Sequence, residues 1–349
     1  MEVPERFPQG CGSEKQKGTP FMNLLGIDVA PVGMGSWPLG GRFFAGDQPL
    51  GFPDIDEDSA VHIVHAALDA GIRVFDTASV YGAGHAERLL GTALKGHGEA
   101  LVVSKLGMGF DEASRQVLGD QIDAADVEPA IDASLRRLRR EYIDIMLLHL
   151  NGLPVGTATP IFEAMERARQ AGKIRAYGWS TDFPNSAAAL ASLPGFMAIE
   201  HAMNLFVDVP SIQSVVKDHN LVSLIRSPLA MGVLTGKYDE SKTVSSDDVR
   251  SVNHERRDYF HDGKAAPHHL ANLRAVQDLL RTGGRSLAQG ALGWLMAKSD
   301  RNLPIPGAST VQQVVENAGA IAHGPLPDEV MQQIETLIRR EPEGAPRPR

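Results

Sequence analysis

The sequence of 349 residues has a single cysteine and no long hydrophobic segment. Because Cys11 is the only cysteine, a disulfide within the chain is excluded, which fits a reducing cytoplasm. No stretch approaches the roughly 20 apolar residues that a membrane-spanning helix needs, and residues 1–20 hold no apolar run of signal-peptide length. We therefore predict a cytoplasmic protein with no membrane partner.

The chain is also short of positive charge. Lys and Arg number 34 against 43 Asp and Glu, so the net charge is −9 at pH 7. This balance argues against a nucleic-acid partner and against an anionic membrane surface. The composition, 43% apolar and 22% charged, is typical of a globular protein with a sizeable core, and we expect a monomer by default.

Short apolar runs alternate with helical patterns along most of the chain. Eight runs are typical of buried strands, at residues 28–35, 72–76, 101–105, 143–149, 173–178, 197–201, 221–225 and 303–305. Most are followed by helical spacing of apolar residues, and Thr159-Pro160 is typical of a helix start. The alternation indicates parallel strands with helical crossovers. We predict an α/β fold, a single-domain (β/α)8 TIM barrel, with a doubly wound open sheet as the alternative.

Three segments fall outside this alternation. Residues 1–20 and 341–349 are polar and predict disordered tails on either side of a barrel at 21–340. Residues 237–267 are polar, charged and rich in histidine, and they predict a long loop of the kind that is usually functional or disordered.

Four polar residues follow the predicted strands in an order that suggests chemistry. Asp76 ends one strand, Tyr81 follows it, and Lys105 and His149 end the next two. Barrel active sites are built at these carboxyl ends. An ammonium favours the phenolate of a nearby tyrosine, and a carboxylate holds the ammonium in place. The result would be a proton donor for a carbonyl oxygen, worth about 10²–10⁴ in rate. Singly, each residue is more often a turn, packing or solvated residue, so the joint order carries the prediction.

Further motifs surround these residues. They are Gly71-Ile-Arg-Val-Phe-Asp-Thr-Ala-x-x-Tyr-Gly82, Glu87-x-x-Leu-Gly91, Ile143-Asp-x-x-x-Leu-His149, Ser227-Pro-Leu-x-x-Gly-x-Leu-Thr-Gly-Lys-Tyr238, and Ile305-Pro-Gly-Ala308 with Asn317. In this order, over about residues 25 to 325, the chain resembles the aldo-keto reductase family. The resemblance implies an eight-stranded barrel that uses NAD or NADP to interconvert a small carbonyl compound and an alcohol.

The resemblance also implies roles for residues. Tyr81 would be the general acid/base, Asp76 and Lys105 its tuning pair, and His149 the partner of the substrate oxygen. The cofactor would contact Gly35, Ser180, Thr181, Glu200, Arg226, Ser227, Pro228, Leu229, Gly232, Gly307, Ser309, Thr310, Gln313 and Asn317. Because some barrels of this family look like channel-associated subunits, a non-catalytic cofactor-binding barrel acting as a regulatory subunit is the alternative.

The chain departs from the family pattern at three places. The family commonly has Ser-Asn where this chain has Ser180-Thr181, glutamine where it has Glu200, and often an aromatic residue where it has Arg226. Because Glu200 and Arg226 end adjacent predicted strands, we predict an ion pair between them under the nicotinamide, where a guanidinium can also stack on a flat ring.

The sequence gives partial evidence on the choice between NAD and NADP. Residues 307–317 contain no cation that could pair with a 2′-phosphate, and charge-assisted hydrogen bonds are the strong ones. The prediction therefore favours NAD slightly over NADP. Arg274 or Lys298, from other parts of the chain, could still reach a 2′-phosphate.

Aromatic residues in the variable loops suggest the substrate pocket. Trp37, Phe43 and Phe206 would form apolar walls suited to a sugar or a small aromatic aldehyde, although they could equally pack under a loop. Two competing motifs fail. Gly82-Ala-Gly84 lacks the third glycine of a dinucleotide fingerprint, and His62 and His65 lack the cysteine or carboxylate pattern of a metal site, so we predict no metal.

Overall fold

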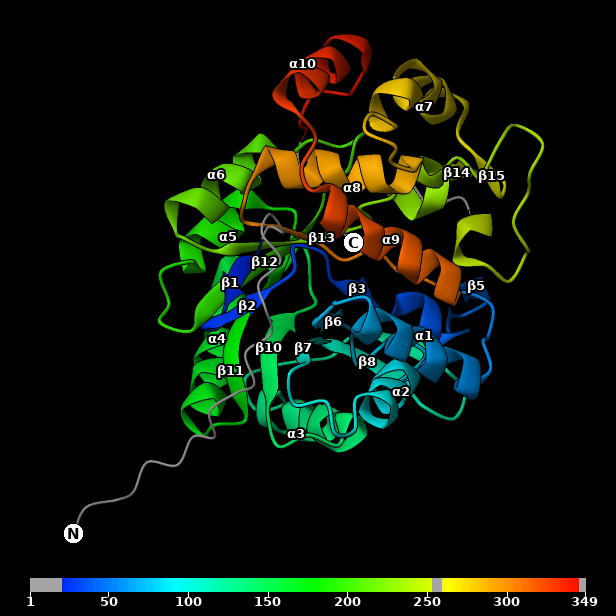
Figure 1. The fold of residues 1–349 in the computed structure, drawn as a ribbon. Coiled ribbons are helices and arrows are strands. Elements are labelled where there is room, and N and C mark those ends of the chain that lie inside the picture. The colour runs from blue at the N-terminus through cyan, green and yellow to red at the C-terminus, as the bar shows by residue number, and fades with distance from the viewer. Residues whose placement is uncertain (1–20, 253–258, 345–349) are drawn as a thin grey trace.

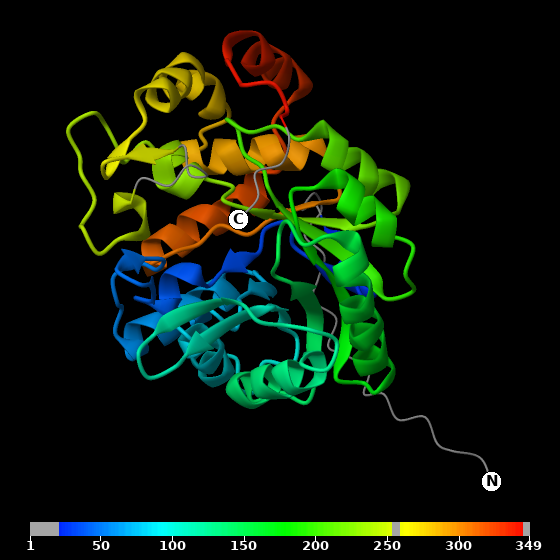
Figure 2. The same cartoon turned by 180° about the vertical axis from the view of Figure 1, so that it is seen from behind.

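The computed structural model describes residues 21–252 and 259–344. The predicted tail at residues 1–20 lies outside the described residues, as do residues 345–349 of the predicted C-terminal tail. The described chain forms a ring of strands surrounded by helices (Figure 1), and Figure 2 shows the same arrangement from behind.

Eight parallel strands form the central sheet. In sheet order they are β16 (Asn302–Pro304), β13 (Val222–Arg226), β12 (Phe196–Ala202), β11 (Ile174–Ser180), β10 (Ile143–Leu148), β7 (Leu101–Leu106), β6 (Val74–Asp76) and β3 (Met34–Gly35). The first and last strands meet, because Gly33 N donates to Pro304 O and Gly35 N to Pro306 O at 2.9 and 3.1 Å. The sheet is therefore closed, which confirms the predicted barrel and excludes the open sheet.

Apolar side chains fill the inside of the barrel. Val103, Ile145, Leu147 and Leu224 are buried there, together with Leu24 from a hairpin at the amino-terminal end of the barrel. The hairpin consists of β1 (Met22–Leu24) and β2 (Ile27–Val29). Strands such as β10 are buried along their whole length, as expected of parallel strands that helices cover.

Helices surround the barrel (Figure 1). They are α1 (Glu57–Asp69), α2 (His85–Ala93), α3 (Val127–Leu138), α4 (Val155–Gln170), α5 (Pro184–Leu190), α6 (Pro210–Asp218), α7 (Pro267–Leu280), α8 (Leu287–Lys298), α9 (Val311–His323) and α10 (Asp328–Leu337). Each turns its apolar face inward, as α3 does with Val127, Ile131 and Leu138. None of the helices among the described residues is long and apolar enough to cross a membrane.

Two predicted boundaries were wrong. The first predicted strand is split, because Ile27–Val29 pairs with β1 and only Met34–Gly35 joins the barrel; Pro31 lies between them and has no N–H to donate. Helix α4 begins at Val155, with Pro160 inside it. In the second turn Pro160 forfeits only one helical hydrogen bond, so the helix tolerates it.

Shorter elements lie in the loops. They are η1 (Trp37–Gly40), β4 (Phe44–Ala45), β5 (Gln48–Pro49), β8 (Met108–Asp111), β9 (Gln116–Asp120), η2 (Ala230–Thr235), η3 (Val249–Ser251), β14 (Phe260–His261) and β15 (Lys264–Ala265). The last three lie in the predicted long loop 237–267. Of the predicted C-terminal tail, residues 341–344 are described, and the carboxylate of Glu343 accepts a hydrogen bond from Ser211 N at 3.2 Å.

Candidate active site

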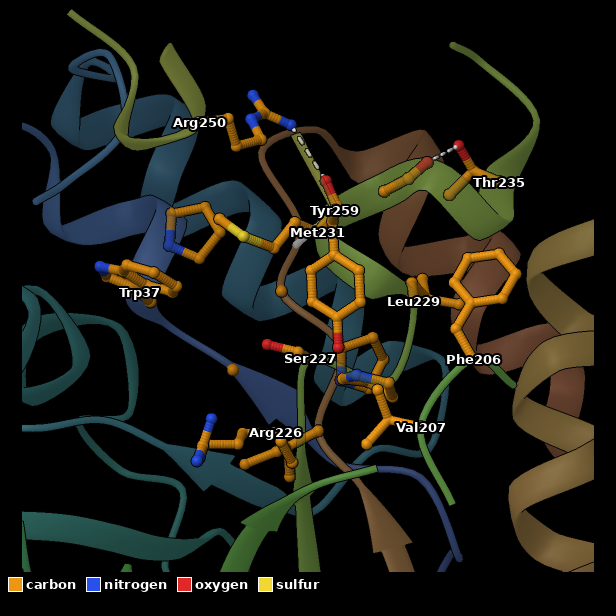
Figure 3. Close-up of a pocket in the computed structure, with 18 of the residues that line it drawn as sticks. Trp37, Phe206, Val207, Arg226, Ser227, Leu229, Met231, Thr235, Arg250 and Tyr259 are labelled. Carbon is orange, nitrogen blue, oxygen red and sulfur yellow. Dashed lines mark hydrogen bonds between the residues drawn. The ribbon is translucent and has the colours of Figure 1, made fainter. Parts of the chain in front are cut away.

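A pocket of about 1700 Å³ opens at the carboxyl ends of the barrel strands. Asp76, Tyr81 and His149 line it, and Trp37, Phe43 and Phe206 form part of its apolar wall, as predicted. Figure 3 shows Trp37, Tyr259 and Phe206 spread across this pocket, with Arg226 and Arg250 toward opposite ends of the view. Three of the four predicted catalytic residues and the predicted substrate-binding residues thus line one cavity.

The chain after β6 is shaped so that Tyr81 faces this pocket. Thr77 N and Ser79 N continue the parallel pairing by donating to Val103 O and Lys105 O at 2.8 and 3.1 Å. Gly82 then takes a φ of +59°, and a Cβ there would lie 1.9 Å from Gly40 O. Only glycine fits at this turn, which explains the Tyr-Gly pair in the sequence.

Lys105 and Asp76 form a buried ion pair. Lys105 Nζ donates to both oxygens of Asp76, at 2.7 and 2.6 Å, and to Thr77 O at 2.8 Å. These acceptors use all three hydrogens of the ammonium. A second carboxylate, Glu200, places its Oε2 3.1 Å from the same Nζ. Lys105 is fully buried, so it acts on the pocket from behind Asp76 and Tyr81.

The buried charges shift one another's pKa values. Burial raises the pKa of Asp76 well above its usual range, the charge of Glu200 raises it further, and Lys105 opposes both effects. Burial alone would lower the pKa of Lys105, but the charges of Asp76 and Glu200 outweigh burial and raise it. Lys105 is therefore a permanent cation, held between two carboxyl groups.

Two aromatic rings and the ammonium of Lys105 lie around Tyr81. Its ring stacks on Trp37 with centroids 6.0 Å apart, and His149 meets it edge-on at 5.9 Å. Lys105 Nζ lies 5.2 Å from the centre of the Tyr81 ring. The four residues predicted from the strand ends are therefore neighbours in space.

Most of the predicted cofactor residues line the same cavity. They are Gly35, Glu200, Arg226, Ser227, Pro228, Leu229, Gly232, Gly307, Ser309, Thr310, Gln313 and Asn317. Thr310 also caps α9, its hydroxyl accepting from Gln313 N at 3.2 Å. The start of a helix therefore lies at the cavity, a position that favours phosphate groups.

Ser180 and Thr181 are buried and do not line the pocket. Ser180 Oγ donates to Glu200 Oε1 at 3.3 Å, so it lies behind a lining residue. Thr181 Oγ1 donates to Asn151 O at 2.7 Å and accepts from Phe183 N at 3.1 Å. The hydroxyl of Thr181 thus joins its own loop to the loop that follows β10, and its cofactor contact stays a prediction.

The predicted Glu200–Arg226 ion pair is wrong. In the described structure Arg226 pairs with Asp182, whereas Glu200 pairs with Lys105. Strand register explains the difference, since Glu200 lies opposite Leu224 and Arg226 lies opposite Ala202, farther along the strand. Asp182 reaches that outer level, where its Oδ1 accepts from Ala202 N at 2.9 Å.

Several lining residues were not predicted as site residues. Asp182, Lys237 and Arg250 all line the pocket. Lys237 belongs to the Thr-Gly-Lys-Tyr motif, which was the available signal. Burial lowers the pKa of Lys237, and the nearby charge of Arg250 lowers it further. Two cations therefore lie together on one side of the cavity.

Comparison with known proteins agrees with this geometry. The model of the aldo/keto reductase family matches residues 31–339. The chain belongs to this family. It is 29% identical to the aldo-keto reductase YhdN of Bacillus subtilis over 321 residues, covering 90% of this chain and 91% of the relative. The chain is also 28% identical to a probable voltage-gated potassium channel subunit beta of Oryza sativa. The match covers 91% of this chain and 95% of that relative.

Solved structures of the family have the same fold. The glycerol dehydrogenase of Gluconobacter oxydans superposes with a TM-score of 0.76 at 29% identity, covering 92% of this chain and 95% of that one. An aldo-keto reductase of Bacillus halodurans, in its holo form, gives 0.72 at 25% identity, covering 92% and 97%. Family membership implies an NAD(P)-dependent oxidoreductase.

Proposed function

We propose that this aldo/keto reductase interconverts a carbonyl compound and an alcohol by hydride transfer, with Tyr81 as general acid/base. The observation that carries this assignment is the buried Lys105–Asp76 ion pair beside Tyr81 at the floor of the pocket. A purely structural barrel has no need of a buried cation in contact with a pocket tyrosine, and a buried ion pair adds little to stability.

Each residue has a defined chemical role in this assignment. A tyrosine with its ordinary pKa of about 10 is a weak acid at neutral pH, and a nearby ammonium favours its phenolate form. Asp76 holds that ammonium, and His149 offers a second hydrogen bond to the same substrate oxygen. Tyr81 then gives its proton to a carbonyl oxygen or removes it from an alcohol. The nicotinamide cofactor, when bound, supplies or accepts the hydride.

The pocket residues fit such a cofactor. Oε2 of Glu200 is buried at the pocket floor without a hydrogen-bond donor, as an amide-binding position would leave it before the ligand arrives. Lys237 and the N-terminus of α9 suit phosphate groups, and Arg250, which is paired with Asp248, lines the same pocket. These residues, with the 227–232 and 307–317 segments, would hold the cofactor.

The cations near the pocket bear on whether the cofactor carries a 2′-phosphate. Residues 307–317 contain no cation, which led to the tilt toward NAD, but the relatives do not support it: the Schizosaccharomyces pombe relative, 26% identical, is named for NADP(+). Arg274 pairs with Glu240 and Lys298 with Asp208, and neither lines the pocket. Lys237 and Arg250 do line it, so both cofactors stay in the proposal, and titration with NADH and NADPH decides between them.

The pocket walls suggest a small substrate with both apolar and polar groups. Trp37, Phe43 and Phe206 supply rings, and Asn151 and Asp182 lie among the polar lining residues. An aldehyde, ketone or aldose and the matching alcohol fit this lining. The cytoplasmic location and the monomeric state remain predictions from the sequence.

A regulatory, non-catalytic role is the second candidate, because the rice relative is named as a channel subunit. Substitution of Tyr81 separates the two. Tyr81→Phe should lower turnover of aldehydes, ketones or alcohols by about 10²–10⁴-fold, since it removes only the transferable proton. Cofactor affinity, measured by calorimetry, should stay within about twofold of the wild type. Turnover retained in Tyr81→Phe would refute the assigned role, and no turnover of any tested substrate by the wild type would favour the regulatory candidate.

A further inference from the structure

Glu200 is a buried carboxylate without a matching donor. It is 1% exposed, and its Oε1 accepts a long hydrogen bond from Ser180. Its Oε2 lies 3.1 Å from Lys105 Nζ but receives no hydrogen bond, because the ammonium already donates to Asp76 and Thr77 O. An unsatisfied buried carboxylate oxygen is costly. It borders the pocket, so a group entering the pocket can reach it.

The charges around Glu200 do not balance. Lys105 faces two carboxyl groups, Asp76 and Glu200, while Arg226 on β13 is paired with Asp182. The neighbouring residue on its own strand, His201, has its pKa lowered to about 4 by burial and is neutral near pH 7. With every carboxyl group ionised, this end of the pocket carries one negative charge more than its cations offset. Proton uptake by Asp76, whose pKa is raised, or an incoming positive charge would remove the excess.

We propose that Glu200 makes the site discriminate between the two oxidation states of the nicotinamide cofactor and bind the oxidised form more tightly, which rests on the proposed function. The oxidised nicotinamide ring carries a positive charge and the reduced ring is neutral, while the rest of the cofactor is the same. The reacting ring must come to Tyr81, and Glu200 lies against Lys105, the cation beside that tyrosine, so its carboxylate distinguishes the two forms by charge. The glutamine expected at this position from the family resemblance would not.

A proton should accompany this discrimination. The charge of Glu200 raises the pKa of Asp76, and both carboxyl groups face Lys105. Further charged or polar groups surround them from the neighbouring elements: Arg226 on β13 with its partner Asp182, His201 on β12, the hydroxyl of Ser180 on β11, and Tyr81 beside Lys105. The oxidised cofactor favours the fully ionised pair, so its binding should release a proton and strengthen as pH rises. Binding of the reduced cofactor should depend less on pH.

Isothermal titration calorimetry tests this directly. NAD(P)+ and NAD(P)H are titrated into the full-length wild type, Glu200→Gln, Glu200→Asp and Ser180→Ala, in two buffers of different ionisation enthalpy to count released protons. In Glu200→Gln the preference for the oxidised form should fall about tenfold, as expected for removal of a partly screened charge in a protein interior. Glu200→Asp keeps the charge and should keep the preference. Ser180→Ala changes no charge and should affect both forms alike.

The outcomes are distinct. A preference that is the same in Glu200→Gln and the wild type overturns the inference, even if both forms bind less tightly. Binding of neither form to the wild type overturns the proposed function along with it. If Glu200→Gln does not fold, as judged by circular dichroism, the wild type and Glu200→Asp still decide: failure of the oxidised form to release more protons than the reduced form refutes the role of the carboxylate.

Discussion

The buried side chain of His201 should affect the stability of the protein in acid. It lies fully buried on β12, its Nε2 is 2.7 Å from Ser223 Oγ, and burial lowers its pKa to about 4. In the unfolded chain a histidine has a pKa of about 6.5, so between these values the unfolded state binds the proton and is favoured. The stability contributed by neutral His201 is complete above about pH 6.5 and is lost as the pH falls through about 4.

The expected result is a steeper loss of stability in the wild type than in His201→Gln. From pH 7 to pH 5, His201 should account for about 2 kcal/mol of the fall in unfolding free energy, measured by urea denaturation. Glutamine has no such proton and can still pair with Ser223. His62→Gln, at an exposed position on α1, is the matched control and should retain the wild-type pH dependence. Parallel curves for the wild type and His201→Gln would contradict the assignment.

For single residues, the sequence predicted which side chains reach the site better than it predicted which of them pair with each other. Asp76, Tyr81, Lys105 and His149 could be placed together because each follows a strand, and parallel strands bring their carboxyl ends to one face. The partner of Arg226 could not be predicted, because it depends on the register between β12 and β13. A shift of two positions along β13 places that side chain beside Asp182 rather than Glu200.

At the scale of elements, the sequence predicted the barrel strands and most helices but not the structure within the loops. The barrel strands were predictable because apolar runs and helical periodicity repeat along the chain. The hairpin of β8 and β9 was not predicted, since its residues are mostly partly or fully exposed and show no clear alternation. Helix α4 was predicted to start too late, because a proline usually marks the first turn and here lies inside the helix.

The seam that closes the barrel depends on close approach of two strands. Gly35 on β3 bridges to Gly307, and a Cβ on Gly35 would lie 2.8 Å from the backbone oxygen of Ile305. Gly35→Ala should therefore push the strands apart and lower the unfolding free energy by about 1–3 kcal/mol in urea denaturation.

Gly156→Ala in α4 is the control, because a Cβ there meets nothing within 4 Å. It should leave stability unchanged or raise it by up to about 1 kcal/mol, since alanine favours a helix. Equal stability of Gly35→Ala and the wild type would show that the seam tolerates a side chain.

At the scale of the whole molecule, two loops that lie far apart in the sequence meet beside the pocket. Arg42 Nε donates to Asp247 Oδ2 at 2.9 Å across 205 residues of chain, and Val249 N donates to Gly51 O at 2.8 Å. Arg250 lies over the ring of Phe52, at 5.1 Å from its centre, and both residues line the pocket. The sequence gives no sign of these contacts, because nothing in a local pattern marks two distant polar loops as neighbours.

A cofactor extending from Tyr81 toward α9 would pass beside these contacts, so they should slow its release. Asp247→Asn removes the charge facing Arg42 and should raise the dissociation rate of NAD(P)H about two- to fivefold, the effect of an exposed ion pair. Stopped-flow displacement of the bound, fluorescent cofactor measures this rate. Because salt screens exposed charges, the wild-type rate should approach that of the variant in about 1 M salt.

Glu240→Gln provides the matched control. Glu240 pairs with Arg274 in the same stretch of chain, but neither residue lines the pocket. Its loss removes an exposed ion pair of the same kind without touching the contacts between the two loops. If both variants release the cofactor at the same rate, the loops do not hold it, and the barrier to release lies deeper in the pocket, among the contacts of residues 227–232 and 307–317.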